Sequence, residues 1–145
     1  MCYRQIHNDA RFLNHVVEEV YKICEKEKIH RLIVMGTSGL VPASIIFAKY
    51  GLPYTFIRKK GESTHGPLVE NDIELRHEIA KGKNTAILDD FICSGDTIRR
   101  ILETIGTNPE FIILYCDARK IDRFQKIEVL HTEEYNRQVY HEIYI

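Results

Sequence analysis

The residues best suited to chemistry form one short segment near the middle of the chain. The adjacent carboxylates Asp89 and Asp90 follow an apolar run at 85–88, and a small polar turn comes after them at 93–97. Paired carboxylates can accept hydrogen bonds from ribose hydroxyls or hold a divalent cation through water. Serine, glycine and threonine at a helix start can cradle a phosphate with backbone amides and hydroxyls. The segment predicts a site for a ribose 5-phosphate; an ordinary capped strand end is the alternative.

An alternation of helices and strands is expected to position this segment. Helices are predicted at residues 8–27, 42–50 and 96–105, and strands at 31–36, 53–58, 84–90 and 110–116. The remaining predictions are short strands at 128–130 and 139–145, a long loop at 59–71, and either a strand or a helix at 72–80. This order implies a mainly parallel sheet with helices on both faces, whose ligands bind at the carboxyl ends of the strands. The loops at 36–39, 58–66 and 89–97 should therefore converge.

Composition narrows the class of protein. The chain has 145 residues, of which 44% are hydrophobic, so it predicts one domain with a substantial core. A net charge of −1 argues against binding nucleic acid by general electrostatics. No apolar run approaches the ~20 residues that span a bilayer, and residues 1–10 lack a signal-peptide stretch. We therefore expect no membrane association and a cytoplasmic location. The four cysteines form no CxxC pair and are expected to be free thiols.

Three stretches carry a resemblance to a known family. Residues 87–97, ILDDFICSGDT, resemble the phosphoribosyl pyrophosphate (PRPP) binding signature of type I phosphoribosyltransferases. Residues 34–43, VMGTSGLVPA, are similar to the pyrophosphate loop of that family. Residues 48–59, AKYGLPYTFIRK, are similar to its following helix and strand, including the Arg-Lys ending. The resemblance covers residues 30–117 in the family's order and implies a hood built from the N- and C-terminal segments.

The resemblance implies a role for each matched residue. Asp89 and Asp90 would be catalytic residues that bind the ribose hydroxyls and help place Mg²⁺. The 5-phosphate would be bound by Cys93, Ser94, Gly95, Asp96 and Thr97, and the pyrophosphate by Gly36, Thr37, Ser38, Gly39 and Arg58. In the loop that closes the site, Lys59 and Lys60 would neutralise the departing pyrophosphate and His65 would assist them. The carboxylate of Asp96 is expected to point away from the phosphate, toward the helix dipole.

The acceptor base is left open between two branches of the family. Cys93 stands where hypoxanthine- and guanine-type members carry an aspartate base, which counts against a 6-oxopurine substrate. The loop from Arg58 to His65 looks most like the orotate branch, although its spacing is one residue longer. Asp117 and Arg119 are similar to the Asp-Arg pair near the orotate carboxylate and are candidates for contacting the base. Adenine-type members share the Arg-Lys strand end and tolerate a non-acidic residue at the position of Cys93.

Together these observations predict an α/β protein with a Rossmann-like parallel sheet of about five strands, the type I phosphoribosyltransferase fold with a small hood. Residues 1–145 would form a single domain. The predicted activity is Mg²⁺-dependent transfer of a phosphoribosyl group from PRPP to a small nitrogenous base, by a homodimer that binds no nucleic acid. The alternative is a regulator or sensor that binds PRPP or a nucleotide without catalysis. A PRPP synthetase is a weaker third possibility, because those chains are about twice as long.

Overall fold

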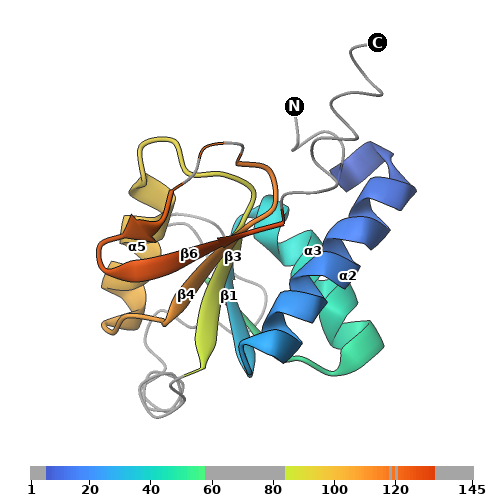
Figure 1. Ribbon diagram of the computed structural model, residues 1–145, viewed down its shortest axis with the longest axis horizontal. Helices are drawn as coiled ribbons and strands as arrows, with labels where there is room; N and C mark the ends of the chain where they lie inside the picture. The colour runs from blue at the N-terminus through green and yellow to red at the C-terminus, as the bar shows by residue number, and fades with distance from the viewer. Residues whose placement is uncertain (1–5, 58–83, 118, 120, 133–145) are drawn as a thin grey trace.

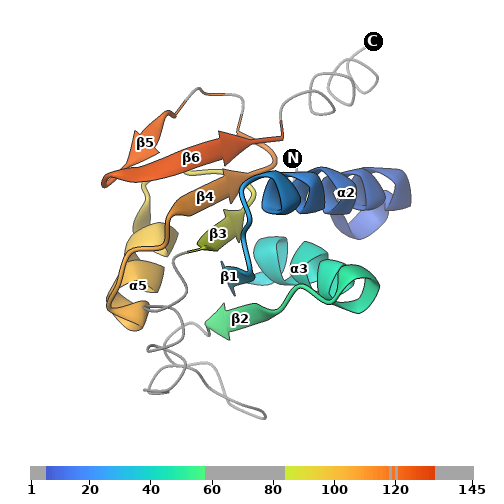
Figure 2. The same ribbon diagram turned by 60° about the horizontal axis from the view of Figure 1, so that its bottom comes forward.

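The computed structural model describes residues 6–57, 84–117, 119 and 121–132. Within them, six strands form one sheet (Figure 1), in the order β2-β1-β3-β4-β6-β5, and Figure 2 labels each of them. The strands are β1 (Arg31–Met35), β2 (Tyr54–Ile57), β3 (Thr85–Asp89), β4 (Phe111–Leu114), β5 (Arg123–Phe124) and β6 (Ile127–His131). Neighbouring strands are parallel except β5, which runs antiparallel to β6. The predicted parallel sheet is confirmed, with a two-residue edge strand added.

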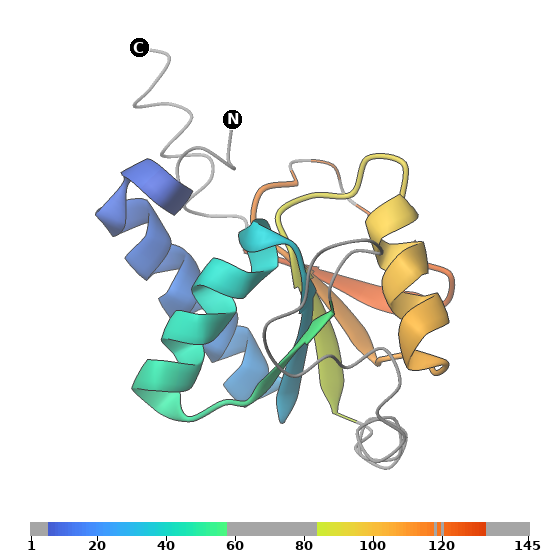
Figure 3. The same ribbon diagram turned by 180° about the vertical axis from the view of Figure 1, so that it is seen from behind.

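Helices cover both faces of the sheet. Helices α2 (Ala10–Lys26) and α3 (Thr37–Tyr50) lie on one face, and α5 (Asp96–Ile105) lies on the other (Figures 2 and 3). Side chains of a strand point alternately to the two faces of the sheet, so β1 contributes side chains to the hydrophobic core on both faces. Leu32 and Val34 belong to the cluster under α2 and α3, whereas Ile33 and Met35 belong to the cluster under α5. Covering both faces explains why the strands are nearly continuous apolar runs.

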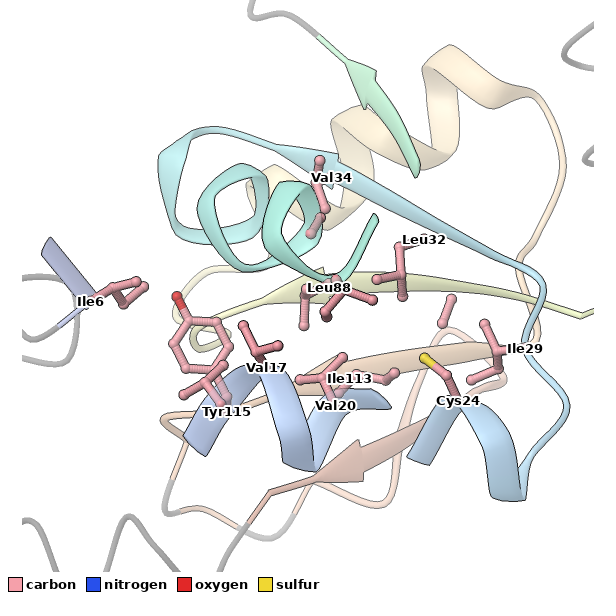
Figure 4. Close-up of a cluster of buried hydrophobic side chains, with 14 of the residues drawn as sticks. Ile6, Val17, Val20, Cys24, Ile29, Leu32, Val34, Leu88, Ile113 and Tyr115 are labelled. Atoms are coloured by element: carbon pink, nitrogen blue, oxygen red, sulfur yellow. The ribbon is translucent and has the colours of Figure 1, made fainter. Parts of the chain in front are cut away.

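The buried stripe of α2 supplies much of the first cluster. Asp9 caps this helix by accepting hydrogen bonds from the backbone amides of Arg11 and Phe12, at 3.0 and 3.2 Å. Figure 4 shows Val17, Val20 and Cys24 facing the side chains that rise from the sheet. Full burial of one aliphatic side chain contributes roughly 1.5–3 kcal/mol. This packing holds α2 against the sheet, and the predicted helix at 8–27 is confirmed with slightly shorter ends.

Helix α3 differs from its prediction. It begins at Thr37, directly after Gly36, rather than at Pro42. Pro42 therefore lies inside the helix, although proline favours the first turn. The sequence prediction placed Pro42 at the helix start for that reason, and the predicted turn at 37–39 is in fact the first turn of α3. Gly36 makes the sharp change of direction, with φ at 82°, a conformation that suits glycine.

The predictions for the rest of the chain have mixed outcomes. The strand at 128–130 is confirmed as part of β6, but β5 was missed. The thiol prediction is wrong for Cys116, which is disulfide-bonded, whereas Cys24 and Cys93 are free. The segments 59–71, 72–80 and 139–145 lie outside the described residues. Among the residues that the structure describes, no helix has the length and apolar character needed to cross a membrane.

Candidate functional site

A pocket of about 430 Å³ opens at the carboxyl ends of β1 and β3, between the first turns of α3 and α5. Parallel strands place their carboxyl ends at one edge, and the loops that leave them meet there. The lining residues come from two segments: Met35, Gly36, Thr37 and Ser38 on one side, and residues 89–98 on the other. The pocket therefore joins segments that stand some fifty residues apart in the sequence.

Most of the predicted site residues in the described part of the chain line this pocket. They are Gly36, Thr37, Ser38, Asp89, Asp90, Cys93, Ser94, Gly95, Asp96 and Thr97. Gly39 is buried behind the pocket, and Asp117 and Arg119 are not among its lining residues. Arg58, Lys59, Lys60 and His65 lie outside the described residues. The sequence analysis did not predict the apolar part of the lining, which comes from Met35, Phe91, Ile92 and Ile98. The hydrophobic pair that follows the two aspartates could have indicated two of these residues, Phe91 and Ile92.

Asp89 and Asp90 form a buried acidic pair at the floor of the site. Their residues are only 6% and 7% exposed. One oxygen of Asp89, Oδ1, accepts hydrogen bonds from the Asp90 amide at 2.9 Å and from the Ser38 hydroxyl at 3.0 Å. Burial, followed by the neighbouring carboxyl of Asp90, raises the pKa of Asp89 to about 7. Near neutral pH this carboxyl is thus poised between its acidic and ionised forms.

The first turn of α3 is held firmly against this pair. Besides the bond from Ser38 to Asp89, the buried phenol of Tyr115 donates a 2.6 Å hydrogen bond to the backbone carbonyl of Ser38. Gly39 leaves room for the close packing of this turn, because a Cβ there would lie 2.6 Å from the Leu88 carbonyl oxygen. Free backbone amides at such a helix start carry partial positive charge and suit an anion.

The first turn of α5 is more open. Gly95 precedes it with φ at 84°, and a Cβ on Gly95 would lie 2.7 Å from the ring of Phe124. Cys93 and Ser94 are exposed, and the Ser94 hydroxyl accepts a 3.3 Å hydrogen bond from the Asp96 amide. The Asp96 carboxylate forms a 3.0 Å ion pair with Arg99 one turn along the helix. This contact agrees with the expectation that Asp96 turns toward its own helix.

Asp117 and Arg119 interact with each other beside the pocket. The carboxylate of Asp117 accepts hydrogen bonds from the Arg119 guanidinium at 3.1 Å and from the Ile92 amide at 3.4 Å. These bonds outweigh the desolvation of Asp117 and lower the pKa of its carboxyl. Asp117 therefore ties the strand end after β4 to the loop that follows Asp90. The contact of Asp117 and Arg119 with a base stays a prediction.

The acidic pair has the chemistry of a partial Mg²⁺ site. Mg²⁺ prefers oxygen ligands and commonly takes one or two carboxylates together with water and substrate phosphates. Neither Asp89 nor Asp90 forms an ion pair within the described part of the chain, so a cation would offset their buried negative charge. Among the described residues, no group of three or more possible metal ligands occurs. The residues present therefore fit Mg²⁺.

Comparisons with known proteins agree with this arrangement. Residues 3–130 match the family described as phosphoribosyl transferase domain. An adenine phosphoribosyltransferase of Clostridium botulinum is 24% identical over 143 residues, covering 88% of this chain and 83% of the relative. The transcriptional regulator GfcR of Methanocaldococcus jannaschii is 22% identical, over 88% and 63% of the two chains. A crystal structure of adenine phosphoribosyltransferase from Thermoanaerobacter pseudethanolicus shares the fold, with a TM-score of 0.57 at 18% identity over 87% and 82%.

Proposed function

Because the chain belongs to the phosphoribosyl transferase domain family, we propose that it transfers the 5-phosphoribosyl group of PRPP to a nitrogenous base and releases pyrophosphate. The observation that carries the proposal is the buried pair Asp89 and Asp90 on the floor of a pocket between two helix starts. Such a pocket offers acceptors for a ribose diol and amide donors for two phosphate groups. This combination matches the chemical make-up of PRPP.

In the proposed reaction, the bond between ribose C1 and the pyrophosphate oxygen breaks while a bond from C1 to a base nitrogen forms, and that nitrogen releases its proton to solvent. The carboxylates of Asp89 and Asp90 would accept hydrogen bonds from the ribose hydroxyls and hold the ring in place. The amides at the start of α5 would bind the 5-phosphate, and those at the start of α3 would bind the departing pyrophosphate. When bound by the two carboxylates, Mg²⁺ would supply positive charge for the leaving group. Arg58, Lys59, Lys60 and His65 keep their predicted roles in the same step.

We propose a base of the adenine or orotate type. Cys93, which stands where hypoxanthine- and guanine-type members carry an aspartate base, remains the argument against a 6-oxopurine. The relationship to an adenine phosphoribosyltransferase favours adenine among the candidates. Asp117 and Arg119 remain the predicted contacts to the base. In that role, binding of the base would loosen or reorient their ion pair.

The test is pyrophosphate release from PRPP and Mg²⁺ with a panel of bases that includes adenine, orotate, hypoxanthine, guanine and xanthine. We expect release with one base, abolished in the double variant Asp89→Asn, Asp90→Asn. A matched control removes two exposed carboxylates elsewhere, Glu103→Gln and Glu110→Gln, and should retain activity. No release with any base, together with no binding of PRPP by calorimetry, would contradict the proposal.

A second candidate function is a regulator that binds PRPP without transferring it. The relationship to the transcriptional regulator GfcR favours this alternative. The two functions are separated by the same experiment, because a regulator would bind PRPP in a manner sensitive to Asp89 and Asp90 but release no pyrophosphate. A sensor also has no need for the basic run from Arg58 to Lys60, which favours catalysis.

A further inference from the structure

Helix α3 has a missing hydrogen bond in the turn that faces the pocket. In an α-helix the amide of one residue donates to the carbonyl four residues earlier. Leu40 follows this rule, since its amide donates to the Gly36 carbonyl at 3.1 Å. Pro42 has no amide hydrogen, so it cannot donate to the carbonyl of Ser38. The Ser38 carbonyl therefore needs a donor from outside the helix.

Tyr115 provides that donor. Its hydroxyl lies 2.6 Å from the Ser38 carbonyl oxygen, and its residue is only 1% exposed. The ring packs among the aliphatic side chains under α2, and the hydroxyl oxygen points away from that helix (Figure 4). The backbone of the same residue donates from its amide to the Asp89 carbonyl at 3.3 Å. Burial, with the charges of Asp90 and Asp89 adding to it, raises the pKa of Tyr115, so the phenol keeps its proton.

Ser38 connects this bond to the acidic pair. Its carbonyl accepts from Tyr115, and its hydroxyl donates to Asp89 Oδ1 at 3.0 Å. We propose that Tyr115 is a positioning residue that replaces the amide donor missing from Pro42 and so keeps the Ser38 hydroxyl on Asp89. This inference rests on the proposed function, because the group that it positions is the pair expected to bind the ribose of PRPP. Tyr115 itself lies below the pocket and is not among its lining residues.

The proposal predicts a specific dependence between two residues that no sequence motif connects. With the hydroxyl removed in Tyr115→Phe, the Ser38 carbonyl loses its donor and the first turn of α3 loosens. We expect the affinity for PRPP to fall by up to about fivefold, no more than removal of the Ser38 hydroxyl itself would cause. Pro42→Ala restores an amide that can reach the Ser38 carbonyl. In that background, Tyr115→Phe should change the affinity by no more than about twofold, since the helix supplies its own donor.

The experiment measures the dissociation constant of Mg²⁺-PRPP by calorimetry for the wild type, both single variants and the double variant. Tyr50→Phe is the matched control. Tyr50 lies at the opposite end of α3, and its hydroxyl donates a 2.7 Å hydrogen bond to Glu18 of α2. This variant should lower the free energy of unfolding without weakening the binding of PRPP. Rescue of PRPP affinity by Pro42→Ala supports the proposal, since lost packing alone would not be restored by an amide.

An equal loss of affinity from Tyr115→Phe in both backgrounds would overturn the proposal, as would a loss of stability with no change in affinity. If the wild type binds no PRPP, the proposed function fails and this positioning role fails with it. Unfolding free energies of the same four proteins would then show whether residues 42 and 115 are coupled at all. If the wild type binds PRPP but Tyr115→Phe has the same effect in both backgrounds, the positioning role fails and the proposed function stands.

Discussion

The starts of α3 and α5 face each other across the pocket, and they are built differently. Both follow a buried strand, and both begin after a glycine with positive φ that provides no side-chain cap. At α3 the turn is closed by two hydrogen bonds to Ser38 and by the tight fit of Gly39. At α5 the side chains of Cys93, Ser94 and Asp96 are exposed, and Asp96 pairs with Arg99 of the same helix. The start of α3 is fixed to the core, whereas the start of α5 carries exposed polar side chains.

This difference suggests a division of work within the proposed reaction. The fixed start of α3 carries the Ser38 hydroxyl, which lowers the pKa of Asp89. Small changes in this turn should therefore alter the protonation of the acidic pair in the pocket. The open start of α5 can bind a phosphate with its backbone amides. Substitutions of its exposed side chains should lower the free energy of unfolding less than substitutions at the start of α3. Substitutions in the two turns test that division, and the four that follow run from the largest expected effect to the smallest.

Asp89→Asn should remove a pH dependence of stability. The folded protein keeps the Asp89 proton up to a pKa of about 7, whereas the unfolded chain releases it near 3.8. Stability from this group is therefore present below pH 3.8 and lost as the pH rises toward 7. Without Mg²⁺ or ligand, the wild type should lose about 3 kcal/mol of unfolding free energy from pH 5 to pH 8. Urea titrations should show that loss abolished in Asp89→Asn but retained in Asp96→Asn.

Gly39→Ala should destabilise the fold by about 2 kcal/mol, because the added Cβ meets the Leu88 carbonyl at 2.6 Å and the Val34 side chain at 2.9 Å. The matched control is Gly51→Ala at the other end of α3, whose Cβ would meet nothing within 4 Å. It carries only the strain of a left-handed conformation, φ 76° and ψ 10°, which costs about 1 kcal/mol. Chemical denaturation measures both variants. Equal losses would show that the first turn of α3 is not tightly packed.

Ser38→Ala should move the pH dependence of PRPP binding upward. The hydrogen bond from Ser38 lowers the pKa of Asp89, so its removal raises that pKa and leaves less ionised carboxylate at neutral pH. The affinity for PRPP should also fall about fivefold, which corresponds to about 1 kcal/mol. Calorimetry across pH 6 to 9 gives the midpoint. Ser94→Ala, in the opposite turn, should leave the midpoint in place, and an equal shift there would remove the distinction between the turns.

Arg99→Ala should have the smallest effect. Its ion pair with Asp96 is formed by side chains that are 48% and 68% exposed, and such pairs contribute roughly 0–1 kcal/mol. We expect a loss of less than about 0.5 kcal/mol in thermal or chemical unfolding, decreasing further with added salt. A larger loss that persists in high salt would mean that the start of α5 is held as firmly as that of α3.

The parts of the molecule that sequence predicted best are those with local signals. The apolar run before Asp89 and the turn at 93–97 gave the strand, the helix start and most of the pocket. The start of α3 was misplaced because proline is commonest at a first turn, whereas here the distant Tyr115 donates to the carbonyl that Pro42 leaves without a helical donor. A long-range hydrogen bond of this kind leaves no periodic pattern in the sequence.

The missed hairpin has a similar explanation. Gln125 and Lys126 connect β5 to β6 and both have positive φ, at 47° and 69°. Such turns are usually signalled by asparagine or glycine, which are absent here. The hairpin places Phe124 beside Gly95, a contact between residues far apart in sequence. Tertiary packing therefore selects this turn, and the residues in it gave no local indication.

The order of strands in the sheet also bears on how the protein acquires its binding ability. The pocket joins the end of β1 to the end of β3, which are neighbours in the sheet although residues 36 to 84 separate them in the chain. Pairing strands that are so far apart in the chain is slow, because the entropy of closing the intervening segment is lost before the contacts form. A chain in which β1 and β3 are not paired therefore lacks this pocket. Ligand bound there should protect β1 and β3 together from hydrogen exchange, so that occupancy of the site reports on the integrity of the whole fold.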